Sequence, residues 1–74
     1  MNKEQLIDKM KNEYGRVILK DDGNKILAAP FKLYIENGKY VITENVERTG
    51  NIELLETADE DKACLFFWNI LHKS

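Results

Sequence analysis

Residues 31–44 read FKLYIENGKYVITE, and this stretch decides the fold that the sequence predicts. Asn37-Gly38 lies between two runs in which apolar and polar residues alternate. This dipeptide favours a two-residue type I′ turn, because both central residues of that turn need positive φ. Counting outward from the turn gives the predicted cross-strand pairs Glu36–Lys39, Ile35–Tyr40, Tyr34–Val41, Leu33–Ile42 and Lys32–Thr43.

The predicted hairpin has one apolar face and one mostly polar face, because side chains alternate along a strand. The face expected to meet the core carries Phe31, Leu33, Ile35, Tyr40 and Ile42. The opposite face, expected to be mostly solvated, carries Lys32, Tyr34, Glu36, Lys39, Val41 and Thr43.

The chain before this hairpin allows two interpretations. Residues 16–20 (RVILK) and 25–29 (KILAA) flank the turn signal Asp21-Asp22-Gly23-Asn24, so they could form a second hairpin. Alternatively, residues 16–20 are a loop and 25–36 form one long strand. Proline has no amide hydrogen to donate to a strand ladder, which favours a break or bulge at Ala29-Pro30.

After the hairpin, a turn at Gly50-Asn51 precedes another predicted strand over residues 51–56, NIELLE. Alternation turns Ile52 and Leu54 toward the core and turns Glu53 and Leu55 away from it. Leu54 and Leu55 are therefore predicted to lie on opposite faces of the sheet.

An amphipathic helix is predicted over residues 2–14. Asn2 can cap it, and Gln5 three residues later completes a capping-box pattern. Gly15 follows as a stop signal, since glycine accepts the left-handed conformation that often ends a helix. The apolar stripe consists of Leu6, Ile7, Met10 and Tyr14.

A second helix is predicted to open at Thr57-Ala58-Asp59-Glu60, with Thr57 as the cap and Glu60 returning to it, and to continue over residues 62–73. Leu65 falls nearly opposite its apolar face and Trp68 falls on the flank. Either the first helix covers these two side chains, or they belong to a partner or dimer surface. The apolar face carries Ala63, Cys64, Phe66, Phe67, Ile70 and Leu71.

These elements predict an α+β fold: a three- to four-stranded antiparallel meander with an N-terminal and a C-terminal helix packed on one face. The 74 residues suffice for a single domain, residues 1–74, with one small core. A composition of 43% hydrophobic and 32% charged residues argues against disorder.

Charge is distributed unevenly along the chain, whose net charge is −2. Residues 1–40 hold eight Lys/Arg against six Asp/Glu, whereas residues 41–74 hold three against seven. Phosphate contacts need a basic face, so the acidic second half argues against nucleic acid as a partner. It permits a basic protein partner, although the same acids could serve only to keep a small protein in solution.

The expected location is the cytoplasm. The single cysteine, Cys64, excludes an intrachain disulfide, and residues 1–14 lack the apolar segment of a signal peptide. No apolar run approaches the length that spans a membrane, so no membrane association is expected.

The residues that usually carry chemistry are sparse. His72 is expected to cap a helix end, and Cys64 to behave as a small buried hydrophobe. Asp59-Glu60-Asp61 lacks the ligand spacing of a calcium loop and suits the positive end of a helix dipole instead. We therefore expect no catalytic residues, no cofactor, no metal site and no enzyme activity.

Three segments carry a family resemblance: residues 34–42 (YIENGKYVI), Glu47-Arg48, and residues 59–67 (DEDKACLFF) with Ile70-Leu71. Over about residues 31–71 the chain resembles small bacterial immunity proteins, which protect a cell from polymorphic or contact-delivered toxins. Trp68 and the Thr49 spacer have no place in this pattern. The resemblance implies a stoichiometric inhibitor of a cognate toxin domain, without catalytic residues of its own.

Three functions follow as hypotheses. The first is a toxin-neutralising immunity protein, with a basic toxin domain as its partner. The second is a self-associating structural or adaptor domain that forms a homodimer, and the third is a small enzyme or ligand-binding domain, which would need an enclosed pocket with titratable groups. The residues predicted to contact a partner are Tyr34, Glu44, Glu47, Glu53, Leu55, Glu56 and Trp68.

Overall fold

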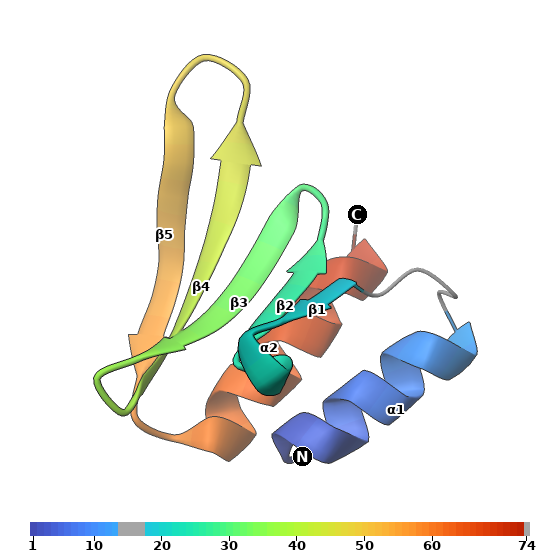
Figure 1. Ribbon diagram of the computed structural model, residues 1–74. Helices are drawn as coiled ribbons and strands as arrows, with labels where there is room; N and C mark the ends of the chain where they lie inside the picture. The colour runs from blue at the N-terminus through green and yellow to red at the C-terminus, as the bar shows by residue number, and fades with distance from the viewer. Residues whose placement is uncertain (14–17, 74) are drawn as a thin grey trace.

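The computed structural model describes residues 1–13 and 18–73, in which a five-stranded antiparallel meander follows one helix along the chain and precedes another (Figure 1). The sheet order β1-β2-β3-β4-β5 follows the chain, which confirms the predicted α+β meander. Neither helix of this described part is long and apolar enough to cross a membrane. The elements are α1 (Lys3–Glu13), β1 (Ile18–Lys20), β2 (Lys25–Ala28), β3 (Phe31–Glu36), β4 (Lys39–Val46), β5 (Gly50–Thr57) and α2 (Glu60–Lys73).

The central hairpin of β3 and β4 forms as predicted. Asn37 and Gly38 have φ values of 52° and 76°, as a type I′ turn requires. All of the predicted cross-strand pairs, from Glu36↔Lys39 to Lys32↔Thr43, are observed. The register of the sheet centre is therefore fixed by its turn.

The sheet has five strands, where three or four were predicted, because β1 and β2 form a separate hairpin. A short 3₁₀ turn, Asp21–Gly23, joins them, and β1 pairs with β2 from Ile18↔Leu27 to Lys20↔Lys25. The alternative of one strand over residues 25–36 is wrong. The chain reverses at Ala29-Pro30, whose peptide bond is cis, so that Ala28 pairs with Phe31.

Helix α1 begins with the predicted capping box. The Asn2 carboxamide accepts a hydrogen bond from the Gln5 amide at 2.8 Å, and the Gln5 carboxamide accepts one from the Asn2 amide at 2.9 Å. Leu6 and Met10 are fully buried, as the apolar stripe predicted. Tyr14 and Gly15 lie outside the described residues.

Helix α2 begins later than predicted, because β5 continues through Thr57. Asp59, and not Thr57, caps the helix: its carboxylate accepts a hydrogen bond from the Lys62 amide at 3.2 Å. The Thr57 hydroxyl accepts one from the Asp59 amide at 3.1 Å. Glu60 does not return to Thr57 but accepts a hydrogen bond from the Lys3 amide of α1 at 2.8 Å, which links the starts of the two helices.

Both helices pack on the same face of the sheet, and one core cluster joins them to it. Ile35 and Tyr40, which were predicted for this face, are partly buried at its edge. Leu54, Leu55, Phe66, Ile70 and Leu71 pack around the cluster. Its buried members are Leu6, Met10, Ile26, Phe31, Leu33, Ile42, Ala63, Cys64 and Phe67.

A β-bulge in β5 overturns part of the predicted alternation. Ile42 pairs with Leu55 and Thr43 pairs with Glu53, which leaves Leu54 as the extra residue. Leu55 therefore shares the inner face with Ile42, and the prediction that it points away from the core is wrong. Ile52 also lies on the inner face, but it is 40% exposed, because the β4–β5 hairpin extends beyond the helices (Figure 1).

Candidate functional site

The face of the sheet opposite the helices is not covered by any described element, and we call it the outer face (Figure 1). Residues paired directly across antiparallel strands point to the same side, so the registers define cross-strand rows on this face. One row contains Lys20, Lys25, Tyr34, Val41 and Glu56, and the next contains Ile18, Leu27, Lys32, Thr43 and Glu53. Glu36 and Lys39 form a third row.

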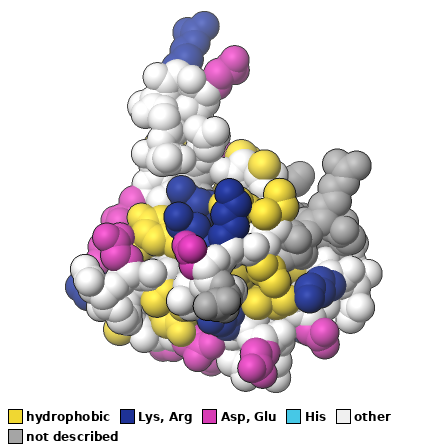
Figure 2. Space-filling view, in the orientation of Figure 1, with side chains coloured by type: hydrophobic (Ala, Val, Ile, Leu, Met, Phe, Trp, Pro, Cys, Tyr) yellow, Lys and Arg dark blue, Asp and Glu magenta, His cyan; other side chains and the backbone are white. Residues whose placement is uncertain are grey.

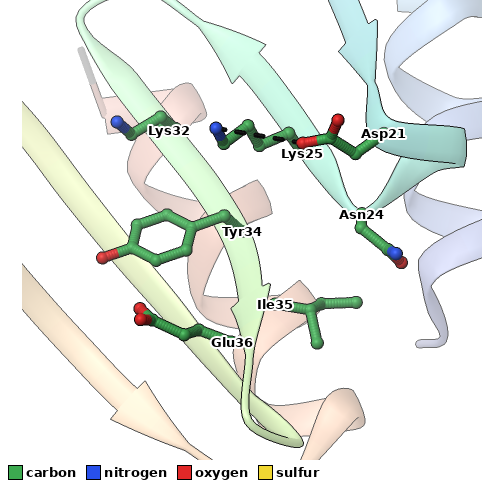
Figure 3. A pocket seen from close by; sticks show the side chains of 7 residues that line it. All are labelled: Asp21, Asn24, Lys25, Lys32, Tyr34, Ile35 and Glu36. Carbon is green, nitrogen blue, oxygen red and sulfur yellow. Dashed lines mark ion pairs between the residues drawn. The ribbon is translucent and has the colours of Figure 1, made fainter.

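Strand β3 forms a ridge along the middle of the outer face. Its residues Lys32, Tyr34 and Glu36 point to one side, whereas Ile35 points away from them (Figure 3). The Lys32 Nζ atom lies 5.4 Å from the centre of the Tyr34 ring, close enough for a cation–π contact. An aromatic ring therefore stands at the centre of the face with a cation beside it.

Open hollows lie on both sides of this ridge. One, of about 190 Å³, brings together Tyr34, Glu53 and Glu56 with Lys39 and Val41. Another, of about 380 Å³, is seen in Figure 3 and is lined by Asp21, Asn24, Lys25, Lys32, Tyr34, Ile35 and Glu36. A third, of about 310 Å³, lies toward Ile18, Leu27 and Pro30 and shares Lys32 with the second.

Opposite charges occupy opposite sides of the outer face. Lys20, Lys25 and Lys32 lie on β1, β2 and β3, whereas Glu53 and Glu56 lie on the edge strand β5. Lysine or arginine side chains gather beside hydrophobic ones on the side of the molecule that Figure 2 shows. The exposed ion pairs Lys25–Asp21 at 3.9 Å and Lys39–Glu56 at 3.5 Å tie some of these charges to neighbours.

Two residues of this face are less exposed than predicted. Val41 and Thr43 are only 5% and 7% exposed, although both were expected on a mostly solvated face. They lie on β4 between longer cross-strand neighbours, Tyr34 with Glu56 and Lys32 with Glu53, whose side chains are long enough to cover them. The Thr43 hydroxyl is fully buried and has no hydrogen-bond partner in the described part of the chain.

The residues predicted to contact a partner divide among several places. Tyr34, Glu53 and Glu56 meet in one hollow of the outer face. Glu47 lies in the turn between β4 and β5, and Glu44 faces the inner side opposite Ile52. Leu55 packs against the core, and Trp68 lies on α2.

The residues predicted to contact a partner did not include Lys25, Lys32, Glu36 or Lys39. The alternation of β3 and β4 already placed the last three on the outer face, so that signal was present. Lys25 could not be placed, because its strand had two possible interpretations. The predicted set therefore recognised the acidic side of the face and missed its basic side.

Trp68 is covered from the first helix, as one of the two interpretations of α2 required. The Lys9 Nζ atom of α1 lies 5.4 Å from its ring centre, and the His72 ring meets it edge to face at 4.4 Å. Leu65 is not covered in this way and is 50% exposed. His72 lies near the end of α2, with its Nδ1 atom 3.0 Å from the Trp68 carbonyl oxygen.

The titratable groups of the interior are not arranged for nucleophilic chemistry. Burial, with a smaller contribution from the Glu60 carboxylate, raises the pKa of the Cys64 thiol to about 11. Burial raises the pKa of Tyr40 as well, with smaller contributions from the Glu60 carboxylate and from Cys64. A thiol with a raised pKa is a poor nucleophile at neutral pH. Among residues 1–13 and 18–73, no group of three or more His, Cys, Asp or Glu side chains is placed to hold a metal ion.

Comparison of the chain with models of known protein families, with curated proteins and with solved structures gives no significant match. The resemblance to small bacterial immunity proteins therefore depends on the sequence segments that carry it. The geometry of the outer face is the independent observation on which a functional proposal can be built.

Proposed function

We propose that this chain is a non-catalytic protein-binding domain that acts as an immunity protein and neutralises a cognate bacterial toxin domain by stoichiometric binding. The observation that carries the proposal is the open outer face, where a central tyrosine stands between hollows and charged residues surround it. Tyrosine is enriched at binding hot spots, because it combines a large apolar ring with a polar tip.

The outer face is too small to form a typical protein–protein interface by itself. Five strands spaced about 4.8 Å apart, with 3, 4, 6, 8 and 8 residues and so a mean length of about six, cover roughly 400 Å². A typical protein–protein interface uses about 800 Å² of each partner. We therefore place the remaining contacts on the β4–β5 hairpin, which extends beyond the helices and carries Glu47 in its turn (Figure 1).

The charges of this surface support a more specific partner than the net charge does. Glu47, Glu53 and Glu56 favour a basic patch on the toxin domain, which opposite charge would steer toward β5. Lys25 and Lys32 require acidic or neutral groups on the other side of the same interface. The partner that fits is therefore a protein with a basic region bordered by acidic residues.

The test is to purify the protein together with the product of the neighbouring gene and to measure stoichiometry and toxin activity. We expect a one-to-one complex in which the toxin is inactive. Tyr34→Ala should weaken the complex at least about tenfold, as loss of a hot-spot side chain does. Lys62→Glu, on the exposed side of α2, is the matched surface control. If the neighbour encodes no toxin domain and no tight partner co-purifies, the proposal is wrong.

A further inference from the structure

The outer face has a charge pattern that matches a second copy of itself. Across the sheet, Lys25 on β2 and Glu56 on β5 belong to the same row, as Glu36 on β3 and Lys39 on β4 belong to another. A surface with opposite charges on its two sides is self-complementary if a two-fold rotation exchanges those sides. This question is independent of the proposed toxin partner, because it concerns the isolated protein.

A two-fold axis that runs parallel to the strands, above the boundary between β3 and β4, makes this exchange. It places β3 opposite β4 of the second copy, and β2 opposite β5. Lys25 then faces Glu56 of the second copy, and Glu36 faces Lys39. These contacts add to the exposed ion pairs Lys25–Asp21 and Lys39–Glu56 that each copy already makes. Tyr34 faces the position of Val41, which is itself only 5% exposed, so the Tyr34 rings supply the apolar surface at the centre and the charged pairs surround it.

The alternative axis, perpendicular to the strands, is unfavourable. It would place each strand over the same strand of the second copy, so Lys25 would face Lys25 and Glu56 would face Glu56. Like charges held opposite one another destabilise an interface. The charge pattern therefore selects one orientation of the two sheets, with their strands aligned as in a β-sandwich.

The spacing and the area are also consistent with this arrangement. Stacked sheets lie about 10 Å apart, a distance that facing lysine and glutamate side chains can span. Roughly 400 Å² from each copy gives about 800 Å² in total, which is below the roughly 1,200 Å² at which stable specific interfaces begin and falls among weak, transient contacts. A dimer of this size is weak, and its dependence on exposed ion pairs makes it sensitive to salt.

We infer that the isolated protein forms a weak face-to-face dimer in which the outer faces of two copies pack together about a two-fold axis parallel to β3 and β4. The occupant of the face is then a second copy of this chain until a tighter partner displaces it. The toxin domain proposed above would compete with the dimer, because it uses the same face and additional contacts on the hairpin.

The experiment is a charge exchange followed by sedimentation equilibrium from micromolar to millimolar protein. Lys25→Glu and Glu56→Lys should each weaken the dimer about tenfold or more, because a two-fold interface contains every contact twice. The double variant should restore it. Within one copy the two residues lie about 14 Å apart, three strand spacings, so restoration can arise only between copies.

Lys62→Glu is the control, since it changes the same charge on the exposed side of α2, and circular dichroism establishes that each variant is folded. A protein that stays monomeric at millimolar concentration overturns the inference. So does a dimer that survives both single reversals, because it must use another surface, and so does a double variant that remains monomeric. Restoration in the double variant, with weaker association at high salt, supports it.

Discussion

Replacing Thr43 by valine should make the protein more stable, although it removes a polar group from the sheet surface. Thr43 is 7% exposed, and its hydroxyl is buried without a hydrogen-bond partner among the described residues. In the unfolded chain this hydroxyl bonds to water, so folding removes that bond without replacing it. Valine has nearly the same shape and an equal preference for β-strands, but it has no hydroxyl to desolvate.

The expected gain follows from the cost of burying an unpaired hydroxyl. Protein mutational data place that cost at about 1–3 kcal/mol. Because the hydroxyl lies under flexible lysine and glutamate side chains and not in the core, we expect the lower part of this range, about 1 kcal/mol. For a domain of this size, a gain of about 1 kcal/mol raises the melting temperature by roughly 4–8 °C.

The assay is urea denaturation and thermal unfolding of wild type, Thr43→Val and Thr49→Val. Thr49 lies in the exposed turn between β4 and β5, so its replacement should change stability by less than about 0.5 kcal/mol. A loss of stability in Thr43→Val, with Thr49→Val unchanged, would refute the reasoning. It would mean that the hydroxyl has a hydrogen-bond partner in the folded protein.

Three further predictions concern α2. Phe67→Ala should destabilise the fold by about 3–5 kcal/mol in urea titrations because Phe67 is fully buried, whereas Leu65→Ala, at a half-exposed position, should cost about 1 kcal/mol or less. Asp59→Ala should cost about 1 kcal/mol, and an unchanged urea midpoint would contradict its role as the cap. Burial raises the pKa of Cys64 from 9.0 to about 11, so the unfolded chain loses this proton first and stability should fall as the pH rises between these values. This fall should be smaller in Cys64→Ala, and an equal fall would show that other groups cause it.

Local chemistry explains why the sheet centre was predictable from the sequence. Asn37 and Gly38 both have positive φ, and few residue pairs other than Asn-Gly adopt that turn easily. Once the turn is fixed, a hairpin register follows by counting. The same holds for the start of α1, where the side-chain oxygens of Asn2 and Gln5 each accept a hydrogen bond from the other's backbone amide, a contact that involves neighbouring residues only.

The predictions that were wrong concern positions where two neighbouring residues have similar local preferences. There, tertiary contacts decide which residue takes which role. Leu54 and Leu55 are adjacent and equally apolar, and both pack against the core, because the bulge at Leu54 brings Leu55 opposite Ile42. Thr57 and Asp59 are both good capping residues. Thr57 is held in β5 by pairing with Tyr40, and the helix therefore starts from Asp59.

Only the acidic side of the candidate surface was predicted from the sequence, because the position of the basic side depends on tertiary structure. The acidic second half of the sequence suggested an acidic surface and hence a basic partner. Sheet order changes this, because β3 from the first half pairs with β4 from the second, and the lysines of β1–β3 share a face with the glutamates of β5. A net charge summed over the sequence cannot show which charges meet on one face.

Strand order therefore constrains what this face can bind. A uniformly basic partner would gain from Glu53 and Glu56 but would oppose Lys25 and Lys32, at most 14 Å or so away across the sheet. A partner that presents both signs, in the correct orientation, avoids that repulsion. A second copy meets this condition by symmetry, and a toxin domain must meet it by its own arrangement of charges. Specificity for such a domain would then come from the repulsion of mismatched orientations as much as from attraction.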